Sequence, residues 1–269
     1  MTDMDETIRR AVAAGKRKDW PEAIRLWSEI VDHHGGPDAP KKFRAQLWRA
    51  RQTQNGEEAL RKNRLAFKAL ADTSKPIRIN PHLIRGKVRG ELDLDLYPNA
   101  ILPGDWDLAP LVVDETFKHR SVKQHFADGL PWRDTEMFRI YADLIQAGKI
   151  VRGRSTIDEL LEDYREVDAL YESMKQRGFA LPDHLKNRRE ALPHVHIGRA
   201  GEILYGRAGN HRLAIAKILN LDHIICLVHA RHTEWQNLRE RLFSVASESR
   251  RAQLEQGLAD HPDLADLIG

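Results

Sequence analysis

The sequence has 269 residues, of which 41% are hydrophobic and 31% charged, and its formal net charge is +3. This composition predicts a globular protein with one large domain or two modest ones. No apolar run approaches the roughly 18 residues of a membrane span, no signal peptide is recognised at the N-terminus, and the charge is too small to indicate nucleic-acid binding without a concentrated basic patch. The single cysteine, Cys226, cannot form an internal disulfide and is expected in the core. We therefore expect a cytoplasmic protein with no membrane partner.

Residues 1–73 are predicted to be entirely helical. Apolar residues recur at helical spacing at Trp20, Ala23, Ile24, Trp27 and Ile30. With an expected helix over residues 5–16, this segment resembles a tetratricopeptide repeat, in which aromatic and small residues interlock neighbouring helices. A second hairpin is expected from residues 42–54 and 55–70. Because so few repeats are seldom stable alone, the bundle should pack on the rest of the chain, either to bind a partner protein or only to cover a hydrophobic surface.

Strands and helices alternate over residues 76–232, which predicts an α+β domain followed by a helical tail over residues 233–269. A short strand is expected at residues 77–79, and two helices should lie on either side of Leu130. A longer helix should begin at a capping box formed by Ser155 and Asp158 and end at Gly178. A hairpin of residues 194–197 and 202–205 and a strand over residues 223–230 complete the predicted sheet.

The stretch over residues 201–221 is predicted to form a strand, a glycine-rich turn and a buried helix. Gly206 and Gly209 permit backbone conformations that other residues resist, and Asn210 is a favourable N-cap. The turn would expose backbone N–H groups at the positive end of the helix, an arrangement that favours a bound phosphate. The alternative is an ordinary tight turn before a capped helix.

Side chains near this turn are candidates for binding or catalysis. Arg212 is expected to bind a phosphate or, alternatively, to pair with a carboxylate. His211 is expected to donate to a phosphate or shuttle a proton, or else to be a buried hydrogen-bonded residue. Arg231 and His232 follow a strand and would either contribute to the site or occupy a solvated turn. Positive charge on the helix near Lys118 is a further candidate, with a solvated face as the default.

Two other groups of residues carry possible chemistry. Asp105 and Asp107 flank Trp106, and either carboxylate would serve as a general base or hold a divalent ion against phosphates, unless both only stabilise a turn. A histidine metal site was weighed for His194, His196, His211, His229 and His232. No carboxylate or cysteine has diagnostic spacing with these histidines, so no metal site is predicted.

The order of these pieces is similar to that of the ParB N-terminal domain and its sulfiredoxin-like relatives. The similarity rests on the helix end DALYESMKQRG, the hairpin HVHIGRAGEILYG, the GNHR turn, the helix LAIAKILNL and the strand HIICLVHA. It covers residues 157–231 well and extends more loosely from residue 76. The segments GDWD, LPWRDTEMF and ARHTEWQ further resemble an uncharacterised branch of ParB-like nuclease-domain proteins. We recognise no ParB-type helix-turn-helix module after Arg231.

This resemblance implies a nucleotide site on the turn, with CTP in ParB proteins and ATP or ADP in sulfiredoxin-like proteins. Carried onto this chain, the motif comprises Gly209, Asn210, His211 and Arg212. Asn210 stands where sulfiredoxin has its cysteine and where ParB usually has an acidic residue. This difference argues against sulfiredoxin's reduction chemistry and puts metal-assisted CTP binding in doubt.

The sequence thus favours a nucleotide-dependent enzyme, a phosphotransferase or nucleotide hydrolase. It would hold the phosphates of ATP or CTP on residues 206–212 with Arg231 and His232, and Mg²⁺ would bridge them to Asp105 or Asp107. The alternative is a binding or adaptor module with a degenerate pocket. A nuclease is a weaker third interpretation, because no cluster of carboxylates for two metals is visible, and DNA binding stays open.

Overall fold

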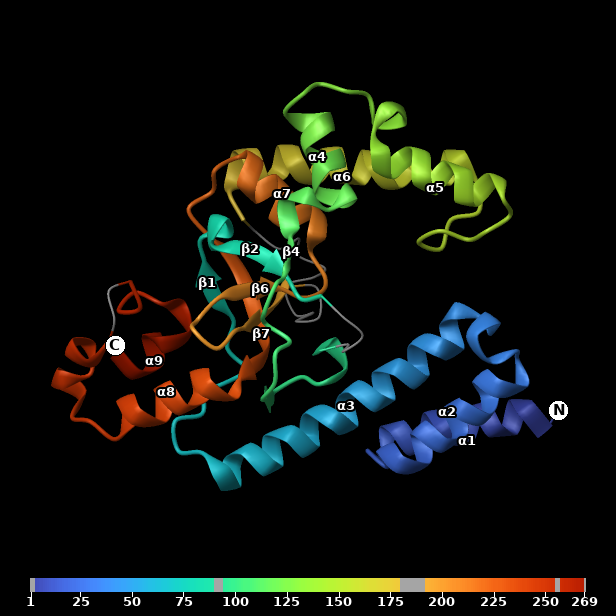
Figure 1. Cartoon of the computed structure of the whole chain (residues 1–269). Helices are drawn as coiled ribbons and strands as arrows, with labels where there is room; N and C mark the ends of the chain where they lie inside the picture. The colour runs from blue at the N-terminus through green and yellow to red at the C-terminus, as the bar shows by residue number, and fades with distance from the viewer. Residues whose placement is uncertain (1–2, 90–93, 180–191, 255–256, 269) are drawn as a thin grey trace.

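The computed structural model describes residues 3–89, 94–179, 192–254 and 257–268, and it is a mixed α+β structure (Figure 1). The helices in these ranges are α1 Asp3–Lys16, α2 Trp20–His33, α3 Lys41–Ala66, α4 Phe117–Phe126, α5 Glu136–Gln146, α6 Ile157–Arg177, α7 Asn210–Ile218, α8 Thr233–Phe243 and α9 Ala265–Ile268. The strands are β1 Ile77–Ile79, β2 Ile84–Lys87, β3 Ala100–Leu102, β4 Leu111–Val112, β5 His194–Ile197, β6 Ile203–Tyr205 and β7 Ile224–His232. The predicted mixture of helices and strands is therefore confirmed.

The N-terminal helices form a bundle with a core of its own. The predicted hairpin is present as α1 and α2, and its apolar residues pack with those of α3 around Leu26, Trp27 and Ile30. The predicted second hairpin is wrong, because α3 runs without a break through Asn55 and Gly56. The segment thus holds one hairpin and one long helix.

The contacts of α3 explain why its Asn-Gly pair is helical instead of forming a turn. A Cβ on Gly56 would lie 2.7 Å from Cγ of Pro98, so the missing side chain lets the loop approach the helix. Asn55 Nδ2 donates to the Leu96 carbonyl (3.0 Å), and Asn99 Nδ2 donates to the Gly56 carbonyl (3.4 Å). Residues that usually favour a turn here join the helical bundle to the mixed domain.

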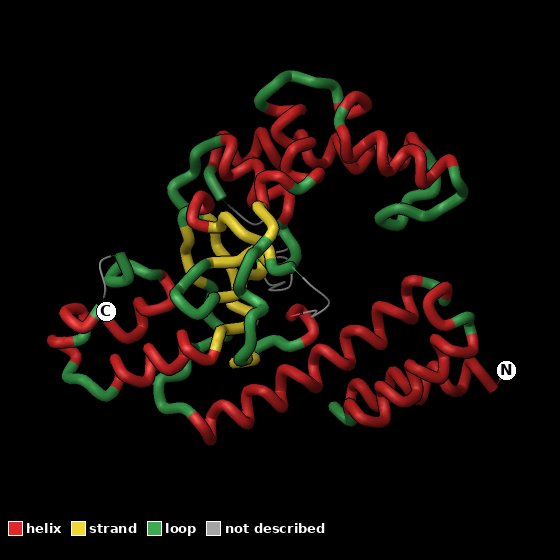
Figure 2. Tube along the Cα trace, in the orientation of Figure 1, coloured by secondary structure: helices red, strands yellow, loops and turns green. Residues whose placement is uncertain are grey.

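The strands lie together at the centre of the molecule, with helices around them (Figure 2). The sheet is mixed, and β7 is the longest strand of the described residues. The strand order among the described residues is β1-β7-β5-β6-β2-β4, and β3 also pairs with β7. β2 is parallel to β6, whereas β3 and β5 are parallel to β7. Because β5 and β6 form an antiparallel hairpin, the carboxyl ends of β2 and β6 lie at one end of the sheet and those of β3, β5 and β7 at the other.

Helices α4, α5, α6 and α7 pack on one side of the molecule, and α8 and α9 lie at the opposite end of β7 (Figure 1). One main core joins residues from all of these elements, including Trp235, Leu242, Leu264 and Leu267 from the C-terminal segment. Cys226 is fully buried in this core, as predicted. In the described parts of the chain, no helix combines the length and the apolar character needed to cross a bilayer.

The helix caps differ from the prediction by single residues. The capping box of α6 is formed by Thr156 and Glu159 instead of Ser155 and Asp158. The Glu159 carboxylate accepts hydrogen bonds from the backbone N–H groups of Ser155 and Thr156, and the Glu159 N–H donates to the Thr156 hydroxyl. Gly178 ends α6 as predicted.

The packing around Gly56 predicts that alanine substitution at two glycines changes the free energy of unfolding in opposite directions. Gly56→Ala should lower the free energy of unfolding by about 1–3 kcal/mol, because the new methyl group meets Pro98. Gly15→Ala, in α1, should instead raise it by roughly 0.5–1 kcal/mol, since the nearest atom to its added Cβ is 3.9 Å away and alanine is the better helix former. Urea unfolding of both variants measures the difference, and stabilisation by Gly56→Ala would contradict the contact.

Candidate functional site

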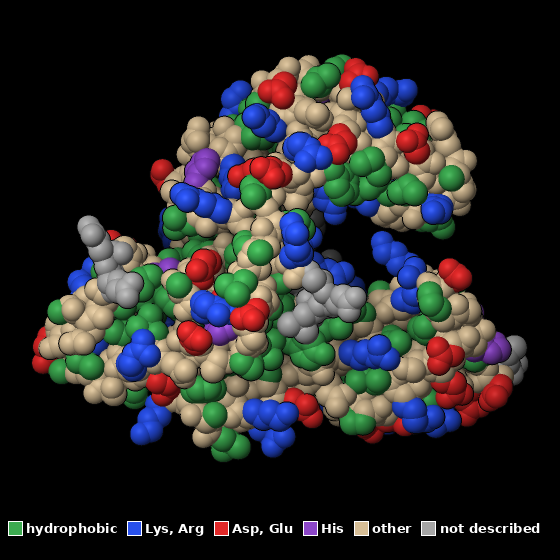
Figure 3. Space-filling view, in the orientation of Figure 1, with side chains coloured by type: hydrophobic (Ala, Val, Ile, Leu, Met, Phe, Trp, Pro, Cys, Tyr) green, Lys and Arg blue, Asp and Glu red, His purple; other side chains and the backbone are tan. Residues whose placement is uncertain are grey.

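The turn between β6 and α7 opens onto a cavity of roughly 1410 Å³. Its walls come from β2, β4, α4, α5, α6 and the turn itself, and Lys and Arg side chains gather around a hollow between the layer of α4–α6 and the N-terminal helices (Figure 3). Among the described lining residues, seven carry positive charge: Lys87, Arg89, Lys118, Arg152, Arg177, Arg207 and Arg212. Three carry negative charge: Glu115, Asp163 and Glu166.

The turn has an unusual and well-fixed backbone. Ala208 and Gly209 are both left-handed, with φ of 61° and 64°. The hydroxyl of Tyr205 donates to the Ala208 carbonyl (2.9 Å), and a Cβ on Gly209 would lie 2.6 Å from Pro193 Cγ. A left-handed alanine costs about 1 kcal/mol or more, and such strain concentrates at functional sites.

The predicted N-cap is wrong by one residue, because Gly209 holds the cap position and Asn210 is the first residue of α7. Within the described structure, no side chain caps this helix. The positive end of α7 thus lies at the turn, a position that favours an anion. Gly206 has a different reason for being glycine, since a Cβ there would lie 2.5 Å from Nε2 of His196.

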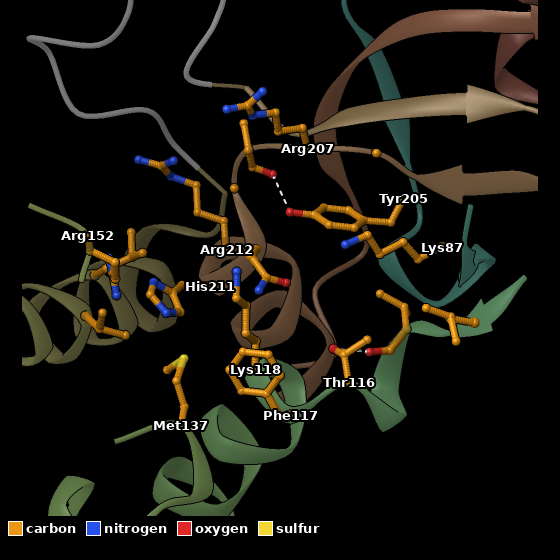
Figure 4. A pocket seen from close by; sticks show the side chains of 18 of the residues that line it. Lys87, Thr116, Phe117, Lys118, Met137, Arg152, Tyr205, Arg207, His211 and Arg212 are labelled. Atoms are coloured by element: carbon orange, nitrogen blue, oxygen red, sulfur yellow. Dashed lines mark hydrogen bonds between the residues drawn. The ribbon is translucent and has the colours of Figure 1, made fainter. Parts of the chain in front are cut away.

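Two lysines reach the cavity from different elements. Lys87 ends β2 and Lys118 lies on α4, and both extend toward the space beside the turn (Figure 4). Partial burial, followed by repulsion from Lys87 and Arg152, lowers the pKa of Lys118. The positive charges are thus close enough to disfavour one another in the absence of an anion.

Arg152 is held in the cavity wall by a tight turn. Val151 and Arg154 exchange two backbone hydrogen bonds of 2.9 and 2.8 Å, and the residues between them, Arg152 and Gly153, have φ of 54° and 88°. The buried carboxylate of Asp163 fixes this turn, since it lies 2.6 Å from the Arg154 guanidinium and 3.9 Å from that of Arg152. Arg152 is the second non-glycine residue of the cavity with a left-handed backbone, a position that asparagine or glycine occupies more easily.

His211 and Arg212, two of the site residues expected from the sequence, both line the cavity. Burial, with smaller contributions from Arg152 and Lys118, lowers the pKa of His211 to about 3. His211 is therefore uncharged at neutral pH and can act as a neutral hydrogen-bonding group. Burial also lowers the pKa of Arg212, but a guanidinium stays protonated throughout the physiological range.

Arg231 and His232 do not line this cavity. The Arg231 guanidinium is buried and forms two hydrogen bonds of 2.8 and 2.5 Å with Asp263. His232 donates to the Gly104 carbonyl (2.8 Å) through Nε2 and accepts from the Glu234 amide at the start of α8 through Nδ1. Both side chains are buried and form structural hydrogen bonds, so they do not occupy the solvated turn that the sequence offered as the alternative.

Asp105 and Asp107 also lie away from the cavity, where both carboxylates accept hydrogen bonds of 2.8 Å from Arg199. The Arg199 backbone N–H donates to Asp107 as well (2.7 Å). Burial opposes ionisation of Asp107, but the hydrogen bonds from Arg199 outweigh it and lower the carboxyl pKa.

Strand direction explains this separation. Residues 206–212 follow β6, whereas Asp105 and Asp107 follow β3, and Arg231 and His232 end β7. Since β3 is parallel to β7 and the β5–β6 hairpin reverses the chain, the two groups leave the sheet at opposite ends. A linear motif cannot reveal this reversal unless the pairing partners are known.

The histidines do not assemble around a common point in the described ranges. The rings of His194 and His229 stack with centroids 4.0 Å apart, and the ring of His196 contacts that of Trp106 edge-on at 6.4 Å. No set of three or more His, Cys, Asp or Glu residues in the described structure is arranged to hold a metal ion. Lys87 and Arg152 also line the cavity, but the sequence analysis did not identify them as site residues. In the sequence, only their charge distinguishes them from their neighbours.

Comparison with protein families, curated proteins and solved structures finds no match to this chain. The resemblance to ParB and sulfiredoxin-like domains therefore stays a prediction.

The buried pair of Arg231 and Asp263 makes a stability prediction. Arg231→Gln should lower the free energy of unfolding by roughly 3 kcal/mol, because it leaves the Asp263 carboxylate buried without its closest cation. Arg241→Gln, on the exposed face of α8, is the control and should change stability by less than about 0.5 kcal/mol. Equal unfolding midpoints for the two variants would show that the pair is not needed.

Proposed function

We propose that the cavity beside residues 206–212 binds a phosphate-bearing ligand of the nucleotide class. Among the described residues, seven cationic side chains gather against three acidic ones around a helix start that no described side chain caps, and this observation carries the proposal. Backbone amides suit phosphate oxygens, and the guanidinium and ammonium groups supply the balancing charge.

The excess of four positive charges among the described lining residues favours a ligand with several negative charges. One phosphate monoester, with a charge of about −2, would leave about half of this excess unbalanced, whereas a triphosphate, with a charge of about −4, would neutralise it. The neutral imidazole of His211 adds a hydrogen-bonding group that does not increase the repulsion.

The cavity also has an apolar wall suited to the organic part of such a ligand. Its members include Phe117, Met137, Tyr141, Val167 and Leu170, which come from α4, α5 and α6. Ligand sites commonly combine such a surface with a few polar groups, and the volume exceeds the usual 300–1,000 Å³ of small-molecule pockets. A nucleotide with its phosphates on the turn and its base on this wall fits the arrangement.

Binding is supported better than catalysis. Phosphoryl transfer was expected to use Asp105 or Asp107 as a base or metal ligand, and these carboxylates are held by Arg199 at the far end of the sheet. A second function, the adaptor, gains support from one contact: the Arg207 guanidinium lies 4.3 Å from the ring centroid of Trp48 on α3. Because Arg207 both lines the cavity and contacts Trp48, a ligand that moves Arg207 would also change the contact with the N-terminal helices. These helices are the proposed surface for a partner protein.

Ligand binding is tested first by thermal unfolding of the full chain with ATP, CTP, GTP or inorganic tripolyphosphate, each with and without Mg²⁺. At about a hundredfold excess over Kd, the melting temperature should rise by roughly 5 °C or more. The double variant Lys87→Gln, Lys118→Gln should lose this shift, while Lys41→Gln, Lys62→Gln, with the same change of charge on α3, should keep it. No shift with any of the compounds would contradict the proposal.

The strained Arg152 allows binding to be separated from folding. Arg152→Asn should leave the free energy of unfolding unchanged or raise it by up to about 1 kcal/mol, because asparagine tolerates the left-handed backbone. The same variant should bind tripolyphosphate about tenfold more weakly, since one cation of the cavity is lost. Arg17→Asn, in an exposed turn outside the cavity, is the control, and unchanged affinity in Arg152→Asn would remove Arg152 from the site.

A further inference from the structure

The nucleotide-dependent enzyme expected from the sequence would hold Mg²⁺ beside the phosphates, so the fit of the cavity to this ion can be tested on its side chains. Mg²⁺ in nucleotide sites is usually held by one or two carboxylates together with the phosphate oxygens. The acidic residues of the described cavity wall are Glu115, Asp163 and Glu166.

Asp163 is already committed to other partners. Its side chain is 8% exposed, and it lies 2.6 Å from the Arg154 guanidinium and 3.9 Å from that of Arg152. Its role is to hold the turn that carries Arg152, so using it as a metal ligand would break this ion pair. Asp163 therefore does not suit Mg²⁺.

The other two carboxylates come from different elements. Glu115 lies in the short segment before α4, whereas Glu166 is on α6, and both are exposed. Nowhere in the described structure do three His, Cys, Asp or Glu side chains converge on a metal position. Seven cationic side chains against three acidic ones make the described cavity wall better suited to an anion than to a magnesium ion.

We propose that this cavity binds the metal-free form of a polyphosphate, and that Mg²⁺ weakens binding instead of assisting it. The inference rests on the proposed function and specifies the ionic form of its ligand. In other nucleotide sites the metal neutralises the phosphates, and here Lys87, Lys118 and Arg152 occupy that role. A bound Mg²⁺ would remove two negative charges from the ligand and compete with these side chains for the same oxygens.

The direct test is isothermal titration calorimetry of the full chain with inorganic tripolyphosphate, in EDTA and in excess MgCl₂, with the ionic strength matched by NaCl. The expected result is an affinity at least roughly tenfold higher in EDTA. Tighter binding in Mg²⁺, or equal binding in both solutions, would overturn the inference and leave the proposed function intact. Binding in neither solution would contradict the proposed function itself.

Substitution of one carboxylate gives a second test, because the two interpretations predict opposite changes in the affinity for tripolyphosphate. Glu166→Gln should raise the affinity for tripolyphosphate in EDTA by about threefold or more, because it removes a repulsive charge from the cavity. If Glu166 held a metal ion, the variant would instead bind more weakly in Mg²⁺, and that result would overturn the inference. Glu172→Gln, on the same helix but outside the cavity wall, is the matched control and should change neither affinity.

Discussion

The excess of positive charge around residues 206–212 is the constraint on which the functional interpretation depends. Like charges held close together destabilise a fold, and the lowered pKa of Lys118 beside Lys87 and Arg152 reflects this repulsion. Two left-handed non-glycine residues, Ala208 and Arg152, add backbone strain in the same cavity. The proposed polyanion would offset this repulsion.

The direction of the strands decides which side chains can share this site. β2 and β6 end at the cavity, so Lys87 and Tyr205 reach it together with the turn. The opposite end of the sheet is occupied by ion pairs of Arg199 and Arg231, which bring β3, β5, β7 and the C-terminal segment together. One end of the sheet is thus held by ion pairs, and the other end carries the cavity.

Features that depend on residues close together in the sequence could be predicted from it. The hairpin of β5 and β6, the helices α1, α2 and α6, and the buried Cys226 follow from local periodicity, turn residues and apolar runs. Contacts between segments far apart in the sequence could not be predicted. Asn55 and Gly56 look like a turn until Pro98 is placed against them, and the short polar strand β2 gains its identity only from pairing with β6. For the same reason, the turn itself was identified, but its cationic partners Lys87 and Arg152 were not.

The central claim is that backbone amides at the start of α7 contact the phosphates. Heteronuclear NMR of the full chain during addition of tripolyphosphate tests it most directly. The account predicts the largest changes at the amide resonances of Asn210, His211 and Arg212, with little change at Arg199 and His232. The reverse pattern, with changes confined to Arg199 and His232, would place the anion at the other end of the sheet and contradict the account.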